Sequence, residues 1–188
     1  MKTFGAILAA FGVTVTVWGA QPAFGDQNDP RLAPLFEGLM EAPRDSRNAA
    51  SIEQEIWAIW VQPATASGRV LMRQGTLQMQ NFDLMGAIDT FTALIEIEPE
   101  FAEAWNKRAT IHYLVGNLAE SLTDIEQVMA LEPRHFGAQA GRGLVLDAMD
   151  LDEAALEEYE RALEMNPHMT SIRDRLEALR DELQGRDL

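Results

Sequence analysis

The chain has 188 residues, and its 30 acidic residues against 15 basic ones give a formal net charge of −15. A protein surface with this excess of acidic residues repels phosphate backbones, which argues against nucleic-acid binding. Hydrophobic residues make up 47 %, enough for a continuous core, and the absence of cysteine excludes disulfides, thiolate catalysis and Cys-based metal sites.

Residues 1–25 have the three parts of a secretory signal peptide. A positive charge at Lys2 precedes an uncharged stretch from Phe4 to Trp18, and small residues at Ala23 and Gly25 follow. We expect cleavage between Gly25 and Asp26 and export across the inner membrane, most simply to a bacterial periplasm. The alternative is an uncleaved N-terminal anchor, for which the 17 residues from Phe4 to Ala20 are short against the roughly 20 residues of a spanning helix.

Residues 26–67 are predicted to form a pair of helices, either a degenerate repeat or a cap. Two apolar stripes with helical spacing are separated by Pro43, and the second ends at Pro63. The stripes consist of Leu32, Leu35, Phe36, Leu39 and Met40, then Ile52, Ile56, Ile59 and Trp60. The segment 63–68 is the predicted linker, a possible hinge to the rest of the chain.

The next part of the chain repeats itself with a fixed period. Pro99, Pro133 and Pro167 lie 34 residues apart, and each ends an acid-rich helical run. This spacing defines three units, 68–101, 102–135 and 136–169, without insertions. Residues 170–188 follow, with an apolar face opposite a charged one, as a terminal capping helix requires.

Within each unit, small and large apolar residues recur at fixed places. The small positions are Gly75, Ala109 and Gly143, then Ala87, Ser121 and Ala155; the large ones include Phe91, Ile125 and Tyr159. This pattern resembles the tetratricopeptide-repeat (TPR) family over 102 of the 188 residues. The resemblance implies an all-α, right-handed solenoid of three helix–turn–helix repeats, with an N-terminal helical pair and a C-terminal capping helix.

Some positions depart from the family pattern. Gln74, Arg108 and Arg142 stand where the family has a large apolar residue, and we expect their stems to pack with the polar heads at the edge. Asn117 with Glu120 and Asp150 with Glu153 are predicted to cap second helices. Trp57, Trp60 and Trp105 are interpreted as core anchors.

No catalytic residues, metal site or cofactor are expected. The three histidines, at 112, 135 and 168, lack the spacing of converging zinc ligands, and His135 and His168 belong to turns between units. The chain has no P-loop, Gly-x-Ser-x-Gly or His-Glu-x-x-His motif. An enzyme is therefore the least favoured of three classes of function.

The resemblance implies instead a concave groove, lined by the first helix of each unit, that binds a peptide or helix of a partner protein. By position, the candidate groove residues are Met72, Thr76, Met79, Asn106, Thr110, Tyr113, Leu114, Ala140, Leu144 and Asp147. The carboxylate clamp of some relatives is absent, since its positions hold Met72, Thr76, Lys107, Gly137 and Gly141. The alternative is a structural or self-associating subunit of an envelope complex whose groove the N-terminal helices fill.

Overall fold

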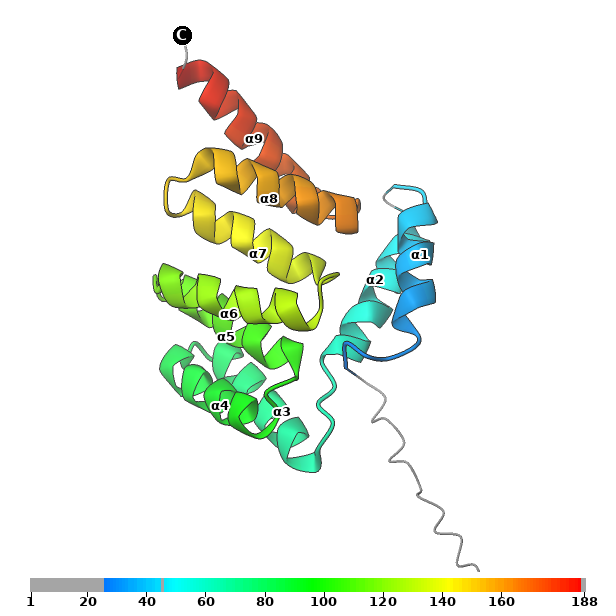
Figure 1. Cartoon of the computed structure of the whole chain (residues 1–188), viewed down its shortest axis with the longest axis vertical. Helices are drawn as coiled ribbons and strands as arrows, with labels where there is room; N and C mark the ends of the chain where they lie inside the picture. Colours follow the sequence, from blue (N-terminus) through cyan, green and yellow to red (C-terminus); the bar gives the residue numbers. More distant parts are fainter. Residues whose placement is uncertain (1–25, 45, 187–188) are drawn as a thin grey trace, which may run out of the picture.

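The structure is a computed structural model that describes residues 26–44 and 46–186; the predicted signal peptide lies outside this part. The described residues form nine α-helices and no strand (Figure 1). The helices are α1 (Leu32–Glu41), α2 (Arg47–Trp60), α3 (Ala66–Gln80), α4 (Leu84–Ile97), α5 (Ala102–Leu114), α6 (Leu118–Leu131), α7 (Phe136–Asp147), α8 (Asp152–Met165) and α9 (Thr170–Arg186). The predicted all-α class is confirmed.

Helices α3 to α8 form three consecutive helix–turn–helix pairs that stack on one another, and α9 covers the last pair (Figure 1). The small residues of the first helices allow this close packing. A Cβ atom at Gly75 would lie 2.7 Å from the ring of Phe91, and one at Gly143 would lie 2.5 Å from the ring of Tyr159. The predicted solenoid of three repeats is therefore confirmed, with small residues set directly against large ones.

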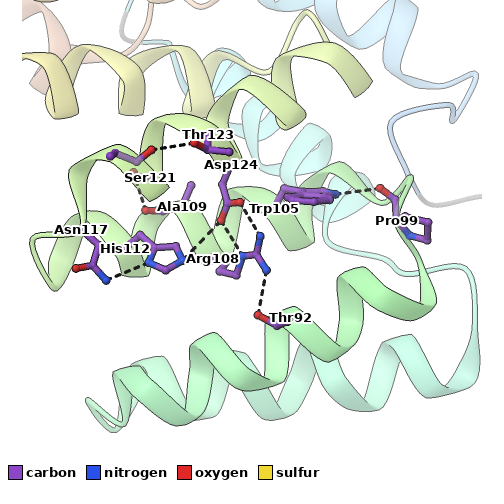
Figure 2. A network of polar contacts seen from close by, with 11 residues as sticks. Thr92, Pro99, Trp105, Arg108, Ala109, His112, Asn117, Ser121, Thr123 and Asp124 are labelled. Carbon is purple, nitrogen blue, oxygen red and sulfur yellow. Dashed lines mark hydrogen bonds and ion pairs between the residues drawn. The ribbon is translucent and has the colours of Figure 1, made fainter.

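The guanidinium groups of Arg108 and Arg142, which were expected to lie at the edge of the units, make ion pairs between helices. Arg108 of α5 makes a bidentate ion pair with Asp124 of α6, at 2.8 Å and 2.7 Å, and a 3.0 Å hydrogen bond to Thr92 of the preceding unit (Figure 2). One repeat later Arg142 lies 3.6 Å from Glu158. The polar residues thus join the two helices of a unit instead of only reaching the edge.

The turns inside the units differ from the predicted capping boxes. Phe82, Gly116 and Asp150, at the same place in the three units, all have positive φ, at 60°, 81° and 57°. Asp150 is therefore a turn residue, and Leu151 is the N-cap of α8 without a side-chain bond. Asn117 occupies the N-cap of α6, as predicted, but its side chain accepts no capping hydrogen bond, and its amide nitrogen lies 3.5 Å from His112 Nδ1 (Figure 2). The prediction for Asp150 is therefore wrong, and for Asn117 only the N-cap position is confirmed.

The N-terminal pair α1–α2 lies beside the stack and is bonded to its inter-repeat turns (Figure 1). The side chain of Gln27 donates a hydrogen bond to the carbonyl of Glu100, and His168 Nε2 donates one of 2.9 Å to the carbonyl of Leu39. Between these, Trp60 stacks on His135. The pair is thus attached at the end of each repeat in turn.

The predicted linker at 63–68 is mostly ordered by contacts with the first repeat. Helix α3 already begins at Ala66, with Thr65 as its N-cap. The carboxylate of Glu98 accepts hydrogen bonds from the backbone amides of Ala64 and Thr65, at 2.9 Å and 3.1 Å. Glu98, at the end of α4, therefore bonds to the segment that connects the N-terminal pair to the first repeat.

Exposure separates the apolar residues into two groups. Trp60 is buried, as predicted for a core anchor, whereas Met40 of the first predicted stripe is half exposed. Several exposed apolar side chains lie near the turns within units, among them Phe82, which is 84 % exposed.

Among the helices of the described part, none combines the length and apolar character that crossing a membrane requires.

Candidate partner-binding groove

A pocket of about 260 Å³ opens between α5, α7 and α9. Its lining is apolar and made largely of small residues, including Ala109, Gly137, Ala140 and Gly141. A Cβ atom at Gly141 would have as its nearest neighbour Ile125 Cδ1, at 3.8 Å. The hollow therefore exists because α7 carries short side chains on the face toward α5.

Polar side chains of α5 line the same pocket. Asn106, Thr110 and Tyr113 follow one another along α5 at helical spacing. The hydroxyl of Thr110 donates to the carbonyl of Asn106 at 2.9 Å, and the amide of Asn106 donates to Glu103 at 2.8 Å. Hydrogen-bonding groups thus stand beside an apolar floor, which is the usual composition of a peptide or ligand site.

Glu103 holds the start of α5 to the start of α7. Its carboxylate is 1 % exposed, accepts a 3.1 Å hydrogen bond from His135 Nε2, and forms an ion pair of 2.9 Å with Lys107. Burial alone would raise the pKa of this carboxyl, but Lys107 and His135 outweigh it and lower the pKa to about 2. Glu103 is therefore a buried anion that fixes one end of the pocket.

The structure brings together half of the residues assigned to the groove by sequence. Five of the ten line this pocket: Asn106, Thr110, Tyr113, Ala140 and Leu144. Met169, the last residue of the third unit, and Ser171 and Ile172 of α9, which were assigned only to a cap, line it as well. The signal that could have located them is the apolar stripe of residues 170–183, which must lie against α7 and α8.

Two further groove residues, Met72 and Thr76, line a second pocket of about 420 Å³ beside α3. Met79 packs against the core of the first repeat. Leu114 is 57 % exposed at the end of α5. These residues are therefore not part of one continuous surface with the pocket between α5, α7 and α9.

Asp147, the acid expected at one end of the groove, is engaged within the fold. Its carboxylate accepts two hydrogen bonds of 2.6 Å from Arg175 of α9 and one of 2.9 Å from the hydroxyl of Tyr159. The guanidinium of Arg175 is the main reason that the pKa of Asp147 is lowered. Asp147 thus attaches the last helix to the third repeat.

The N-terminal pair borders the pocket without entering it. No residue before α5 lines the pocket. Trp57 covers Gly137 at the edge of the pocket, where a Cβ atom would lie 2.6 Å from the indole ring.

Within residues 26–44 and 46–186, no group of three or more His, Cys, Asp or Glu side chains is arranged to hold a metal ion.

Comparisons with known proteins agree with this architecture. A family model described as a tetratricopeptide repeat matches residues 137–169. A TPR repeat-containing protein of Rhizobium etli is 34 % identical over 155 residues, covering 82 % of this chain and 76 % of the relative. Tetratricopeptide repeat protein 36 of Bos taurus is 35 % identical over 98 residues, covering 50 % of this chain and 52 % of that protein.

Solved structures share the fold at lower identity. The first TPR domain of Spaghetti (RPAP3), bound to the HSP90 peptide SRMEEVD, has a TM-score of 0.60 at 24 % identity and covers 63 % of this chain and 94 % of that one. The Sgt2 TPR domain from Aspergillus fumigatus has a TM-score of 0.62 at 21 % identity, covering 78 % and 87 %. The fold and the Rhizobium relative together define the class, a helical-repeat protein. The chain belongs to the tetratricopeptide-repeat family.

Proposed function

We propose that this protein is an exported binding module that accepts a peptide or helical segment of a partner protein in the pocket between α5, α7 and α9. The observation that carries the proposal is the hollow itself, an apolar floor of Ala109, Ala140 and Gly141 bordered by Asn106, Thr110 and Tyr113. A site of this composition suits an apolar side chain with backbone polar groups on either side.

Two of the similar structures support the proposal by what they contain. The Spaghetti (RPAP3) domain holds an HSP90 peptide, and the TPR2B domain of yeast Sti1 is in complex with pHsp70. At least two domains of this fold therefore bind proteins or peptides. We expect this protein to bind a partner of different chemistry from that of clamp-containing relatives. Gly137 and Gly141 occupy two clamp positions that hold basic residues in some relatives.

The test fills the pocket without disturbing the core. Gly141→Leu adds a side chain where the nearest atom to a Cβ is 3.8 Å away. A photo-crosslinking amino acid at Thr110, on the pocket wall, is expected to capture the same partner in cells as one at Leu144. Gly141→Leu should abolish both products, whereas a crosslinker at the exposed Gln127 of α6 should not capture that partner.

Capture of that partner from Gln127, or its undiminished capture by the Gly141→Leu protein, would exclude the pocket as the binding site. Gly141→Leu must retain the helical circular dichroism and thermal midpoint of the wild type, so that loss of capture reports on the pocket.

Export forms the second half of the proposal. It is supported by the charged start, the uncharged stretch from Phe4 to Trp18, and the small residues before Asp26. Fractionation of cells followed by N-terminal sequencing should give periplasmic protein that begins at Asp26. Recovery in the membrane fraction with an intact N-terminus would support the anchored alternative instead.

Self-association remains the second candidate function. The observation that favours it is the set of exposed apolar side chains at the turns, including Phe82, Met85 and Leu151. Light scattering of the protein across concentrations separates the candidates. A monomer at all concentrations supports the binding module, and a stable oligomer supports the structural role.

A further inference from the structure

Large apolar side chains are exposed along one side of the repeat stack. The turns within the three units lie above one another on this side, away from α1 and α2 (Figure 1). Residues 80–86, 114–120 and 148–154 form these turns and together make the turn edge. None of its exposed large apolar side chains packs into a hydrophobic core of the described residues; they are Phe82, Met85, Leu114, Met149 and Leu151.

The fold does not require Phe82 at its place on the turn edge. Its φ of 60° is a left-handed conformation that disfavours a residue with a Cβ atom, and its ring is exposed. Gly116 holds the equivalent place in the second unit, where Ala119 stands in place of Met85. The repeat therefore folds without a large apolar side chain at either place. Backbone strain of this kind gathers at functional sites, and exposed apolar patches at interaction surfaces.

The charge of the turn edge has one sign. Its three segments contain no Lys or Arg, and their acidic residues are Asp83, Glu120, Asp150, Asp152 and Glu153. Glu120, Asp150 and Glu153 are exposed, and none of these three forms an ion pair within the described part of the chain. Each unit thus places at least one carboxylate on this edge, which attracts positive charge.

We propose that the turn edge docks a positively charged amphipathic helix of a partner protein. The apolar face of that helix covers Phe82, Met85 and Leu151, and its Lys or Arg side chains face the carboxylates. The apolar side chains alone would equally accept a second copy of the chain, the second candidate function above. The carboxylates decide against it, because two copies that met edge to edge would bring like charges together, as would an anionic membrane.

The turn edge is separate from the pocket proposed above as the binding site. None of its residues lines the pocket between α5, α7 and α9. The inference therefore does not depend on the function proposed for that pocket, and the two sites can fail independently.

The test measures the binding of fluorescein-labelled model helices to the full chain by fluorescence anisotropy. The probe carries Leu on one face and Lys on the other. One matched peptide has Glu in place of Lys, and a second has Ala in place of Leu. The Leu–Lys helix should bind at least about tenfold more tightly than either matched peptide, and added NaCl should weaken its binding.

Two double variants test the apolar side chains at constant charge. Phe82→Gly with Met85→Ala introduces the residues of the second unit and should lower the affinity for the Leu–Lys helix about tenfold. Met40→Ala with Val70→Ala removes exposed apolar side chains outside the turn edge. This control should keep the affinity within about twofold of the wild type.

Two further double variants test the carboxylates. Asp150→Asn with Glu153→Gln should weaken the binding of the Leu–Lys helix, whereas Glu37→Gln with Glu41→Gln, an equal change of charge at exposed residues of α1, should not. Gly141→Leu, which fills the pocket between α5, α7 and α9, should bind the probe like the wild type. All variants must keep the helical circular dichroism of the wild type, so that a loss of binding reports on the surface.

Tighter binding of the Glu–Leu helix, or equal losses in a turn-edge variant and its control, would overturn the proposal. Loss of binding in Gly141→Leu would assign the helix to the pocket instead. An oligomer that dissociates in Phe82→Gly with Met85→Ala, seen by light scattering, would assign the turn edge to a second copy. Flotation with phosphatidylglycerol vesicles that the same variant abolishes would assign it to a membrane.

Discussion

The indole ring of Trp60 and the imidazole ring of His135 stack face to face, with centroids 4.2 Å apart and planes at 9°. His135 is fully buried; its Nδ1 accepts the amide hydrogen of Ala138, so its Nε2 carries the proton donated to Glu103. A single side chain thus caps α7, bonds to α5 and packs against α2. This contact joins the N-terminal pair to the second and third repeats.

Trp60→Ala should release the N-terminal pair from the solenoid. The buried indole contacts Phe36 and Phe136 as well as His135, and removing it costs about 3–5 kcal/mol by the usual scale for large core residues. We expect faster proteolysis between α2 and α3, measured by limited digestion, while most of the helical signal is retained. Trp60→Phe should show a smaller effect, and unchanged digestion of Trp60→Ala would contradict the role of this contact.

Two glycines of α7 should respond oppositely to alanine. Gly143→Ala would place its Cβ 2.5 Å from the buried ring of Tyr159, so we expect destabilisation of about 1–3 kcal/mol. Gly141→Ala meets nothing closer than 3.8 Å and should stabilise the helix by about 0.5–1 kcal/mol. Urea denaturation measures the free energy of unfolding of both variants. Equal changes in the two variants would show that helix propensity alone, and not the contact with Tyr159, determines the effect of alanine.

Phe82→Gly should stabilise the protein. Phe82 has a φ of 60°, a conformation that costs a residue with a Cβ about 1–2 kcal/mol, and its side chain is 84 % exposed. Glycine also gives the unfolded chain more conformational freedom, which offsets part of this gain in stability. We therefore expect a net stabilisation of about 1 kcal/mol, measured as a higher thermal midpoint. Asp150→Gly, at the equivalent place, should gain less, since Asp tolerates this conformation better. A lower midpoint in Phe82→Gly would mean that the ring contributes packing.

Acidification should remove the contribution of Glu103. Its pKa in the folded protein is about 2, below the ordinary 4.5, so its contribution is fully present above pH 4.5 and is lost as the pH falls toward 2. The shift corresponds to about 3 kcal/mol of unfolding free energy. In Glu103→Gln this part of the pH dependence should be missing, when urea denaturation is repeated across that range. Parallel pH profiles of the two proteins would contradict the role of the buried anion.

The sequence determined the repeat architecture because repeat packing is local. The prolines at 99, 133 and 167 end each second helix, and small residues such as Gly75 and Gly143 face the large ones sixteen positions later. These relationships lie within one unit and are therefore visible as a period along the chain. The constant period also placed the first helices of successive units side by side, so five of the ten groove residues, among them Thr110 of the second unit and Leu144 of the third, line one pocket.

Tertiary structure alone decided what occurs between units. The stacking of Trp60 on His135, the hydrogen bonds from Ala64 and Thr65 to Glu98 and the ion pair of Asp147 with Arg175 join residues far apart in sequence, and no recurring residue pattern marks these pairs. Pairing at such distances depends on where whole helices dock. The N-terminal pair docks on the inter-repeat turns, and the end of α2 lines the pocket beside α3 but not the pocket between α5, α7 and α9.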